Sequence, residues 1–215
     1  MPTRVLLAIL AALVFPWSAA LAEQSATVTG PPTAAEATFV HAMQAILTKR
    51  FPTPAQAVAA GYFRYTNEDE TGAISYADLH WQSADVGHPS QLWYDKAGNL
   101  LGADYSVLKT VSARPKLWGI QPGRWDEFGE HIHYVTKDPK TGALGYDHYV
   151  LVPKFVAAGG SLKHPAAATL VKLHLVASAS DVATIFDFPE IWDLIVWVKP
   201  NPNGAFADKN PLVKP

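Results

Sequence analysis

Polar and apolar side chains alternate along two neighbouring stretches in the middle of the chain, residues 131–136 and residues 146–152. Alternation with a period of two, in segments rich in β-branched and aromatic residues, predicts β-strands. Between them the sequence DPKTG at 138–142 supplies a side chain that can cap a turn, a proline and a glycine. This turn chemistry predicts a β-hairpin with its loop over residues 139–142.

The pattern changes to a helical one near the N-terminus. Thr33 and Glu36 belong to the sequence TAAE, a capping box in which the threonine caps a helix and the glutamate returns the hydrogen bond. Apolar residues at positions 39, 43, 46 and 47 follow helical spacing and predict a helix that ends near Arg50. Pro54 at a first helical position and Gly61 just past an end predict a second, shorter helix.

The rest of the chain is mainly strand-like. Strands are predicted at 62–66, 72–81, 91–94, 100–108, 170–176 and 191–198, with a helical turn at 153–158 and a long irregular connection at 111–128. This order predicts one α+β domain over residues 33–215. We expect an N-terminal α-hairpin packed on a mainly antiparallel sheet, arranged as a sandwich or as a partly open barrel.

The first residues predict export. Residues 1–22 carry one arginine, an apolar run and a small-residue ALA sequence, which together are typical of a secretory signal peptide with cleavage after Ala22. The apolar run is too short for a comfortable membrane span. Residues 23–32 predict a flexible lead. We therefore expect a periplasmic or secreted protein with no membrane span in the mature chain.

Charge and cysteine content narrow the classes of function. Of the 17 basic residues in the sequence, 16 follow residue 22, against 19 acidic residues, which gives a net charge of −3 with neutral histidines (16 − 19). This balance does not favour nucleic acid as a partner. The sequence contains no cysteine, which excludes disulfides, a thiol nucleophile and thiolate metal ligands.

The hairpin supplies the sharpest chemical hypothesis. If residues 139–142 form its loop, His133 lies opposite His148, and both share a face with His131. Three imidazoles on one face can converge on a divalent metal ion such as zinc, copper, nickel or iron, and His80 or Glu130 can complete the ligand set. The alternative is a structural hairpin whose histidines stand on its solvated face.

A second hypothesis is a non-catalytic protein that binds a small ligand or a partner in an aromatic cleft. The tryptophans at 81, 93, 118 and 125 are its candidate walls. The sequence shows no GxSxG elbow, no HExxH helix and no phosphate-binding glycine loop, so a hydrolase has little support. Whether the protein is an enzyme is left open.

Four blocks of the sequence carry a resemblance to a protein family. They are AVAAGY at 57–62, LHW at 79–81, LWY and GNLLGADY at 92–105, and VWV, NPNGAFA and NP at 196–211. In combination they resemble a family of small exported bacterial proteins without an assigned function. The family keeps a carboxylate where this chain has Asp104 and a histidine where it has Ile195. The resemblance implies that, of a family site with two histidines and a carboxylate, this chain retains only His80 and Asp104.

Overall fold

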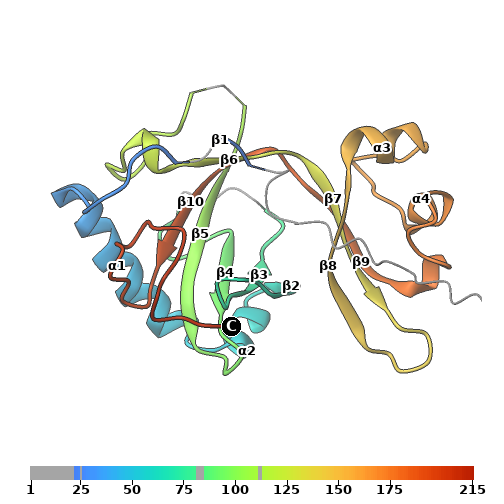
Figure 1. Ribbon diagram of the computed structural model, residues 1–215, viewed down its shortest axis with the longest axis horizontal. Helices are drawn as coiled ribbons and strands as arrows, with labels where there is room; N and C mark the ends of the chain where they lie inside the picture. The colour runs from blue at the N-terminus through green and yellow to red at the C-terminus, as the bar shows by residue number, and fades with distance from the viewer. Residues whose placement is uncertain (1–21, 25, 81–84, 111–112) are drawn as a thin grey trace, which may run out of the picture.

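The computed structural model describes residues 22–24, 26–80, 85–110 and 113–215. In this part of the chain two antiparallel sheets lie side by side, each accompanied by helices, and they form two lobes (Figure 1). Neither sheet closes into a barrel, and the predicted α+β class is confirmed. None of the described helices has the length and apolar character needed to cross a membrane.

The large sheet has seven strands in the order β1-β6-β10-β5-β4-β3-β2. Its strands are β1 (Ala22–Gln24), β2 (Phe63–Glu68), β3 (Ile74–Ala77), β4 (Gln91–Tyr94), β5 (Leu100–Leu108), β6 (Asp126–Phe128) and β10 (Ile191–Trp197). The small sheet has the order β8-β7-β9, from β7 (His131–Lys137), β8 (Leu144–Leu151) and β9 (Val182–Phe188). The helices are α1 (Ala34–Arg50), α2 (Pro54–Ala59), α3 (Val152–Ala157) and α4 (Ala167–Lys172), with 3-10 turns η1 (Pro122–Arg124) and η2 (Ala179–Asp181).

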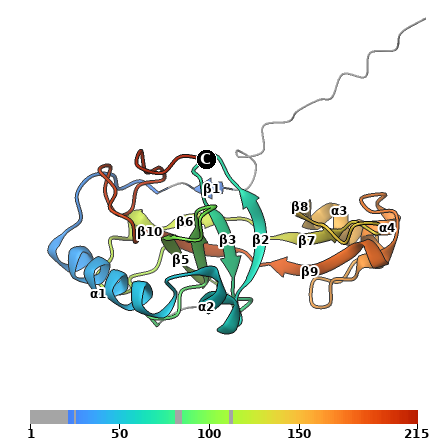
Figure 2. The same cartoon turned by 90° about the horizontal axis from the view of Figure 1, so that it is seen from below.

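The predicted capping box starts α1. The Thr33 side chain accepts a hydrogen bond from the Glu36 N–H, and the Glu36 carboxylate accepts one from the Thr33 N–H. One stripe of the helix, with Phe39, Met43 and Leu47, is buried against the large sheet. Figure 2 shows α1 and α2 along one face of this sheet and the C-terminal end of the chain beyond the other face. The core of the large lobe therefore lies between α1 and the sheet.

The segment predicted as a flexible lead is packed in the structure, from residue 26 onward. The backbone N–H groups of Thr27 and Val28 donate to the Gly123 carbonyl at 2.7 and 3.0 Å. The Arg124 guanidinium donates to the carbonyls of Val28, Gly30 and Pro31. These bonds attach the segment to η1. Residues 1–21 of the predicted signal peptide lie outside the described part of the chain.

A two-stranded ribbon connects the lobes. Strands β6 and β10 pair in the large sheet, with Phe128 opposite Ile191, and the same two chain segments continue as β7 and β9, with His131 opposite Phe188. Residues 129–130 and 189–190 interrupt the ladder between the sheets. The position of the small lobe is thus set by the covalent continuity of both strands.

The central hairpin has the predicted loop but a different register. The Asp138 N–H donates to the Ala143 carbonyl, as a loop over 139–142 requires. Between the Thr136 and Tyr134 rungs, however, the pairing shifts, and Asp147 adopts a left-handed φ of 63°. This β-bulge places one extra residue in β8. The expectation that His133 lies opposite His148 is therefore wrong, and the opposed pairs are His133 with Tyr149 and Tyr134 with His148.

The strand predicted at 170–176 is also wrong. Its first residues belong to α4, which ends in a Schellman motif: the Leu175 N–H donates to the Leu170 carbonyl and the His174 N–H to the Val171 carbonyl. His174 holds the left-handed position with a φ of 56°. The alternating pattern there comes from a helix end, because Leu170 and Leu173 both pack on the small sheet.

Candidate functional site

The small sheet brings two of the three predicted hairpin ligands together. His131 and His133 lie on one face of β7 with their ring centroids 6.0 Å apart, and both are buried. His131 stacks on Phe188 and His133 on Phe186. His148 lies on the opposite face, where its ring stacks on Tyr134.

The other two predicted ligands lie elsewhere. The His80 side chain is 89% exposed, and its Nδ1 lies 2.5 Å from an oxygen of Asp78, whose other oxygen bonds His88 at 2.7 Å. Glu130 lies at the junction of the lobes, where burial and the charge of Glu190 raise its pKa. Among the described residues no group of three or more His, Asp or Glu side chains is arranged to hold a metal ion.

The environment of the two buried histidines keeps them neutral. Burial, together with the neighbouring His131 and His148, lowers the pKa of His133 to about 3. The Nδ1 of His133 has no hydrogen-bond partner in the described structure. The Nδ1 of His131 lies 3.0 Å from the Gly129 carbonyl, so it carries the proton and leaves a lone pair on Nε2.

A pocket of about 300 Å³ opens on the face of the large sheet that points away from α1. Strand alternation builds this pocket face: Leu92 and Tyr94 of β4 join the core with α1, whereas Gln91 and Trp93 line the pocket. The described lining residues are Tyr65, Thr66, Asp69, Thr71, Ala73, Ser75, Gln91, Trp93, Asp104, Phe128, Phe188, Asp193, Ile195, Trp197 and Asp208. Phe128 and Phe188 come from the ribbon that joins the lobes, so both lobes contribute to the wall.

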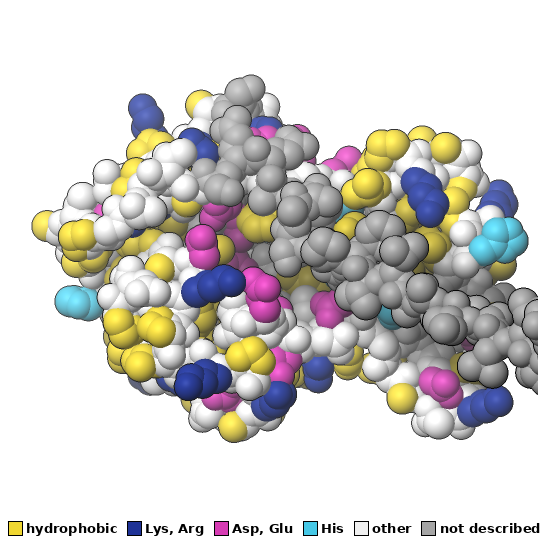
Figure 3. Space-filling view, viewed as in Figure 1, with side chains coloured by type: hydrophobic (Ala, Val, Ile, Leu, Met, Phe, Trp, Pro, Cys, Tyr) yellow, Lys and Arg dark blue, Asp and Glu magenta, His cyan; other side chains and the backbone are white. Residues whose placement is uncertain are grey.

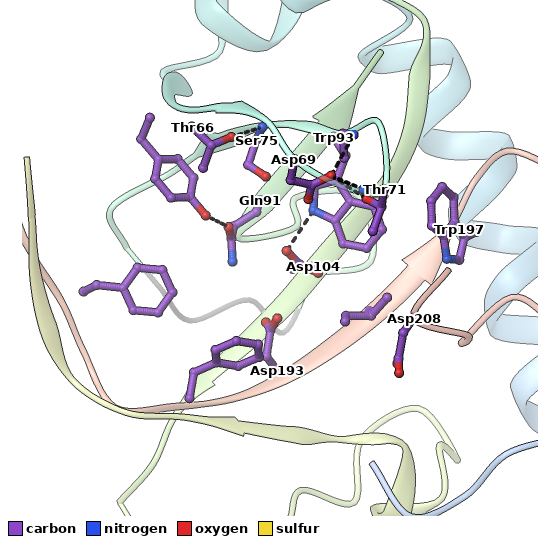
Figure 4. A pocket seen from close by; sticks show the side chains of 15 residues that line it. Thr66, Asp69, Thr71, Ser75, Gln91, Trp93, Asp104, Asp193, Trp197 and Asp208 are labelled. Carbon is purple, nitrogen blue, oxygen red and sulfur yellow. Dashed lines mark hydrogen bonds between the residues drawn. The ribbon is translucent and has the colours of Figure 1, made fainter. Parts of the chain in front are cut away.

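Two buried carboxyl groups lie at the centre of the pocket. Asp104 on β5 pairs with Ile195 on β10, and Asp193 lies two residues before Ile195, so both aspartate side chains share the pocket face. Figure 4 shows the two carboxyl groups directed toward each other across the pocket. The Trp93 indole donates to Asp104 Oδ2 at 2.8 Å, and the Ser106 hydroxyl donates to Asp193 Oδ1 at 2.7 Å.

Burial and mutual repulsion set the protonation of this pair. Burial raises the pKa of Asp104 well above its usual range, and the charge of Asp193 raises it further. Burial likewise raises the pKa of Asp193 to about 7, against the Ser106 hydrogen bond and with a contribution from Asp126. Asp126 lies directly opposite Asp193 on β6, and its carboxylate accepts a hydrogen bond from the Ala26 N–H.

Two tryptophans form a fixed aromatic wall. The Trp93 and Trp197 rings meet edge to face with centroids 5.5 Å apart, and the Trp197 indole donates to the Ala207 carbonyl. Trp93 lies over Gly102, where a Cβ atom would stand 2.6 Å from the indole and 2.7 Å from the Val196 carbonyl oxygen. The absence of a side chain at residue 102 thus lets the indole reach Asp104.

The sequence hypotheses located part of this site. Asp104 and Trp93 line the pocket, whereas Trp118 and Trp125 pack on the α1 side of the sheet and Trp81 lies outside the described residues. Asp193, Trp197 and Gln91 were not proposed as site residues. One signal was present for Asp193: it is a lone charge inside the apolar run IWDLIVW.

The surface around the pocket is acidic as well. Asp69 and Asp208 are exposed residues of the pocket lining. In the space-filling view, several Asp and Glu side chains lie on the visible face of the large lobe (Figure 3). Comparison of the chain with protein-family models, with curated proteins and with solved structures finds no match. The geometry of the pocket is therefore the basis for assigning a function.

Proposed function

We propose that this protein acts outside the cytoplasm as a binding protein that holds a small ligand in the pocket of the large sheet. One observation carries the proposal: Asp104 is only 6% exposed, and its Oδ1 has no hydrogen-bond partner among the described residues. A buried acceptor without a partner costs stability, about 1–3 kcal/mol for a typical group. A ligand that donates a hydrogen bond to Oδ1 offsets this cost.

The shape and walls of the pocket support the same role. Its volume of about 300 Å³ falls at the lower end of the range typical of small-molecule sites. Rigid aromatic rings line it, and a few convergent polar groups are held in place by Trp93, Ser106 and Tyr65. The leader-like residues 1–22 and the lack of cysteine support action in the periplasm or outside the cell.

The test is a binding screen monitored at the pocket itself. In ¹⁵N-labelled protein the indole N–H resonances of Trp93 and Trp197, assigned by Trp→Phe variants, report directly on the wall. We expect at least one class of small cationic, neutral or anionic compound to shift both resonances saturably. Ser75→Leu fills the pocket and should weaken this binding by about tenfold or more, because the ligand loses its space.

Ser161→Leu is the matched control, because Ser161 is exposed and belongs to the small lobe. It should leave binding unchanged. The proposal fails if no compound of any charge class shifts the indole resonances, or if Ser75→Leu binds as well as the wild type.

A second candidate role, binding of a divalent metal ion by the hairpin, is favoured by the unpartnered Nδ1 of His133. Only His131 and His133 share a face, so His148 cannot complete the site from its position on the other face. An ion held there would have to take further ligands from outside the three hairpin histidines.

Elemental analysis by mass spectrometry tests this role, after incubation with zinc, copper, nickel or iron. A bound ion should be lost in His131→Ala/His133→Ala and retained in His148→Ala, since the bulge separates His148 from the other two. Near-stoichiometric metal that is lost equally in His148→Ala would contradict this assignment, and a metal-free wild type would remove the metal role.

A further inference from the structure

The charge of the pocket wall restricts the ligand. Four aspartates line the pocket, Asp69, Asp104, Asp193 and Asp208. None of the described lining residues is a lysine, an arginine or a histidine. An anionic ligand would be repelled by every charged group that it meets, whereas a cation would be attracted by all of them.

The hydrogen-bonding groups point to a donor on the ligand. Asp104 Oδ1 is buried and lacks a partner, while Oδ2 is already used by the Trp93 indole. The side-chain amide oxygen of Gln91 accepts a hydrogen bond from the Tyr65 hydroxyl. A cation bound beside this carboxyl favours its ionised form, in which Oδ1 is a buried acceptor without a partner. The group that satisfies this acceptor has to supply an N–H or O–H.

The aromatic walls favour a positive charge on that donor. Tyr65, Trp93 and Trp197 face the pocket together with Phe128 and Phe188. The faces of such rings attract cations, with Trp the strongest, and the attraction grows where water is excluded. Carboxyl groups at the centre and indoles around them are a combination suited to an ammonium group.

We infer that the ligand is a small primary amine, bound as its ammonium ion with an N–H donated to Asp104 Oδ1 and its carbon chain against the two indoles. This inference rests on the proposed binding function and names the chemical class of the ligand.

A primary ammonium group fits these features better than other cations do. It carries three N–H donors on a compact head, so one can reach Asp104 while another reaches Asp193. A quaternary ammonium ion has no donor and would leave Asp104 Oδ1 unsatisfied. A divalent metal ion would satisfy the carboxylates but would make no use of the apolar walls.

The experiment compares isosteric compounds that differ only in the head group. Butylamine, butanol and butyrate, and the corresponding phenethyl and cyclohexyl series, are titrated into the purified protein, with tetramethylammonium and Ca²⁺ as further probes. We expect the amines to shift the Trp93 indole resonance saturably, and to bind about tenfold or more tightly than the matched alcohols. Butyrate, tetramethylammonium and Ca²⁺ should not compete.

Asp104→Asn tests the acceptor. The substitution is isosteric and keeps an oxygen for the Trp93 indole, but it replaces the charged acceptor by a neutral amide, so amine affinity should fall by about tenfold or more. Asp193→Asn provides a second variant with the same expectation. Glu70→Gln removes the same charge from an exposed pair with Lys209, and it should leave amine binding unchanged.

The outcomes separate this inference from the proposed function. If alcohols or carboxylates bind as tightly as amines, or if Asp104→Asn retains amine binding, the inference of an amine ligand is overturned. The proposed binding function still stands in that case, provided that Ser75→Leu weakens the binding that is observed. Selective binding of Ca²⁺ would also overturn it. If no compound of any class shifts the indole resonances, both fall together.

Discussion

At the scale of single residues, the centre of the pocket differs from two other buried acidic sites of the protein. Buried charged groups are normally paired: Glu36 has Arg124, and Glu127 has Lys109. Asp104 and Asp193 instead face each other, and each accepts a hydrogen bond from a neutral group, the Trp93 indole or the Ser106 hydroxyl. Local violations of this kind are expected at functional sites, where stability is exchanged for binding.

The aspartate pair predicts an inverse dependence of stability on pH. Burial raises the pKa of Asp193 in the folded protein to about 7, whereas an aspartate in an unfolded chain titrates near about 3.9. Because the folded state then binds the proton more tightly, this group favours folding most below about pH 4, and its contribution declines as the pH rises to about 7. Asp104 and Asp126, on the two strands that flank β10, act in the same direction.

Asp193→Asn should remove this decline. We expect the variant to be more stable than the wild type at about pH 8 by on the order of 2 kcal/mol, with a smaller difference at about pH 4. Urea unfolding at both pH values, without added amine, measures the two differences. Asp208→Asn at the exposed rim is the control. A difference between variant and wild type that does not change with pH would contradict the raised pKa.

At the scale of secondary-structure elements, the start of α1 is where prediction and structure agree most closely. The TAAE sequence specifies a capping box from four consecutive residues, and the box forms. Glu36 also accepts hydrogen bonds from Gln121 and Arg124. The sequence around the cap does not predict this second role, because both donors lie about 85 residues further along the chain. Local sequence determines a cap, whereas its tertiary partners depend on the whole fold.

Glu36→Gln should destabilise the protein by about 2–4 kcal/mol, because it leaves the buried Arg124 without a counter-ion. Burial raises the pKa of Glu36, but its hydrogen bonds outweigh burial and lower the pKa to about 2. The stabilisation from Glu36 is therefore complete above about pH 4.5 and is lost as the pH falls toward 2.

Urea unfolding at neutral pH measures the effect, and Glu70→Gln, which breaks an exposed ion pair, is the control that should change little. Equal stability of Glu36→Gln and the wild type would show that the pair with Arg124 does not stabilise the fold.

The hairpin shows why register is harder to predict than a turn. The loop follows from local chemistry in the DPKTG sequence, and it forms as expected. The bulge at Asp147 depends on β2, where the Asn67 N–H donates to the Asp147 carboxylate and Arg64 stacks on Tyr146. No pattern within residues 131–152 contains this information, and a shift of one residue moved His148 to the other face.

At the scale of the whole molecule, the α+β class was predictable because helices and strands differ in period. The pocket was not, since its lining comes from seven strands and two loops that converge only in the folded chain. Trp93 and Asp104 could be identified as candidates from the sequence, but Asp193 is recognised only from its position on β10, diagonally opposite Asp104 on β5.

The lobes share one apolar cluster, and this predicts a single cooperative unfolding transition. Tyr65 of the large sheet packs with Phe186 and Phe188 of the small sheet and with Ile191 of β10. An isolated three-stranded sheet with two short helices would lose this contact and the continuity of both ribbon strands. We therefore expect the two lobes to unfold together, as one domain over residues 33–215 would.

The composition of the chain makes this prediction measurable. The tryptophans at 93, 118, 125, 192 and 197 belong to the large lobe, and residues 126–190 contain none, so tryptophan fluorescence does not report on the small sheet. Because the sequence has no cysteine, Val156→Cys on the exposed side of α3 can carry a single fluorophore that reports on the small lobe. The two probes should give the same urea midpoint and the same slope.

Phe188→Ala sharpens the test. The ring is buried, stacks on His131 and lines the pocket, so its removal should cost about 3–5 kcal/mol. If the shared cluster couples the lobes, this loss of stability lowers the urea midpoint reported by both probes. Two distinct midpoints in the wild type would instead show that the lobes fold independently, and that the pocket wall contributed by Phe128 and Phe188 is a contact between two separate domains.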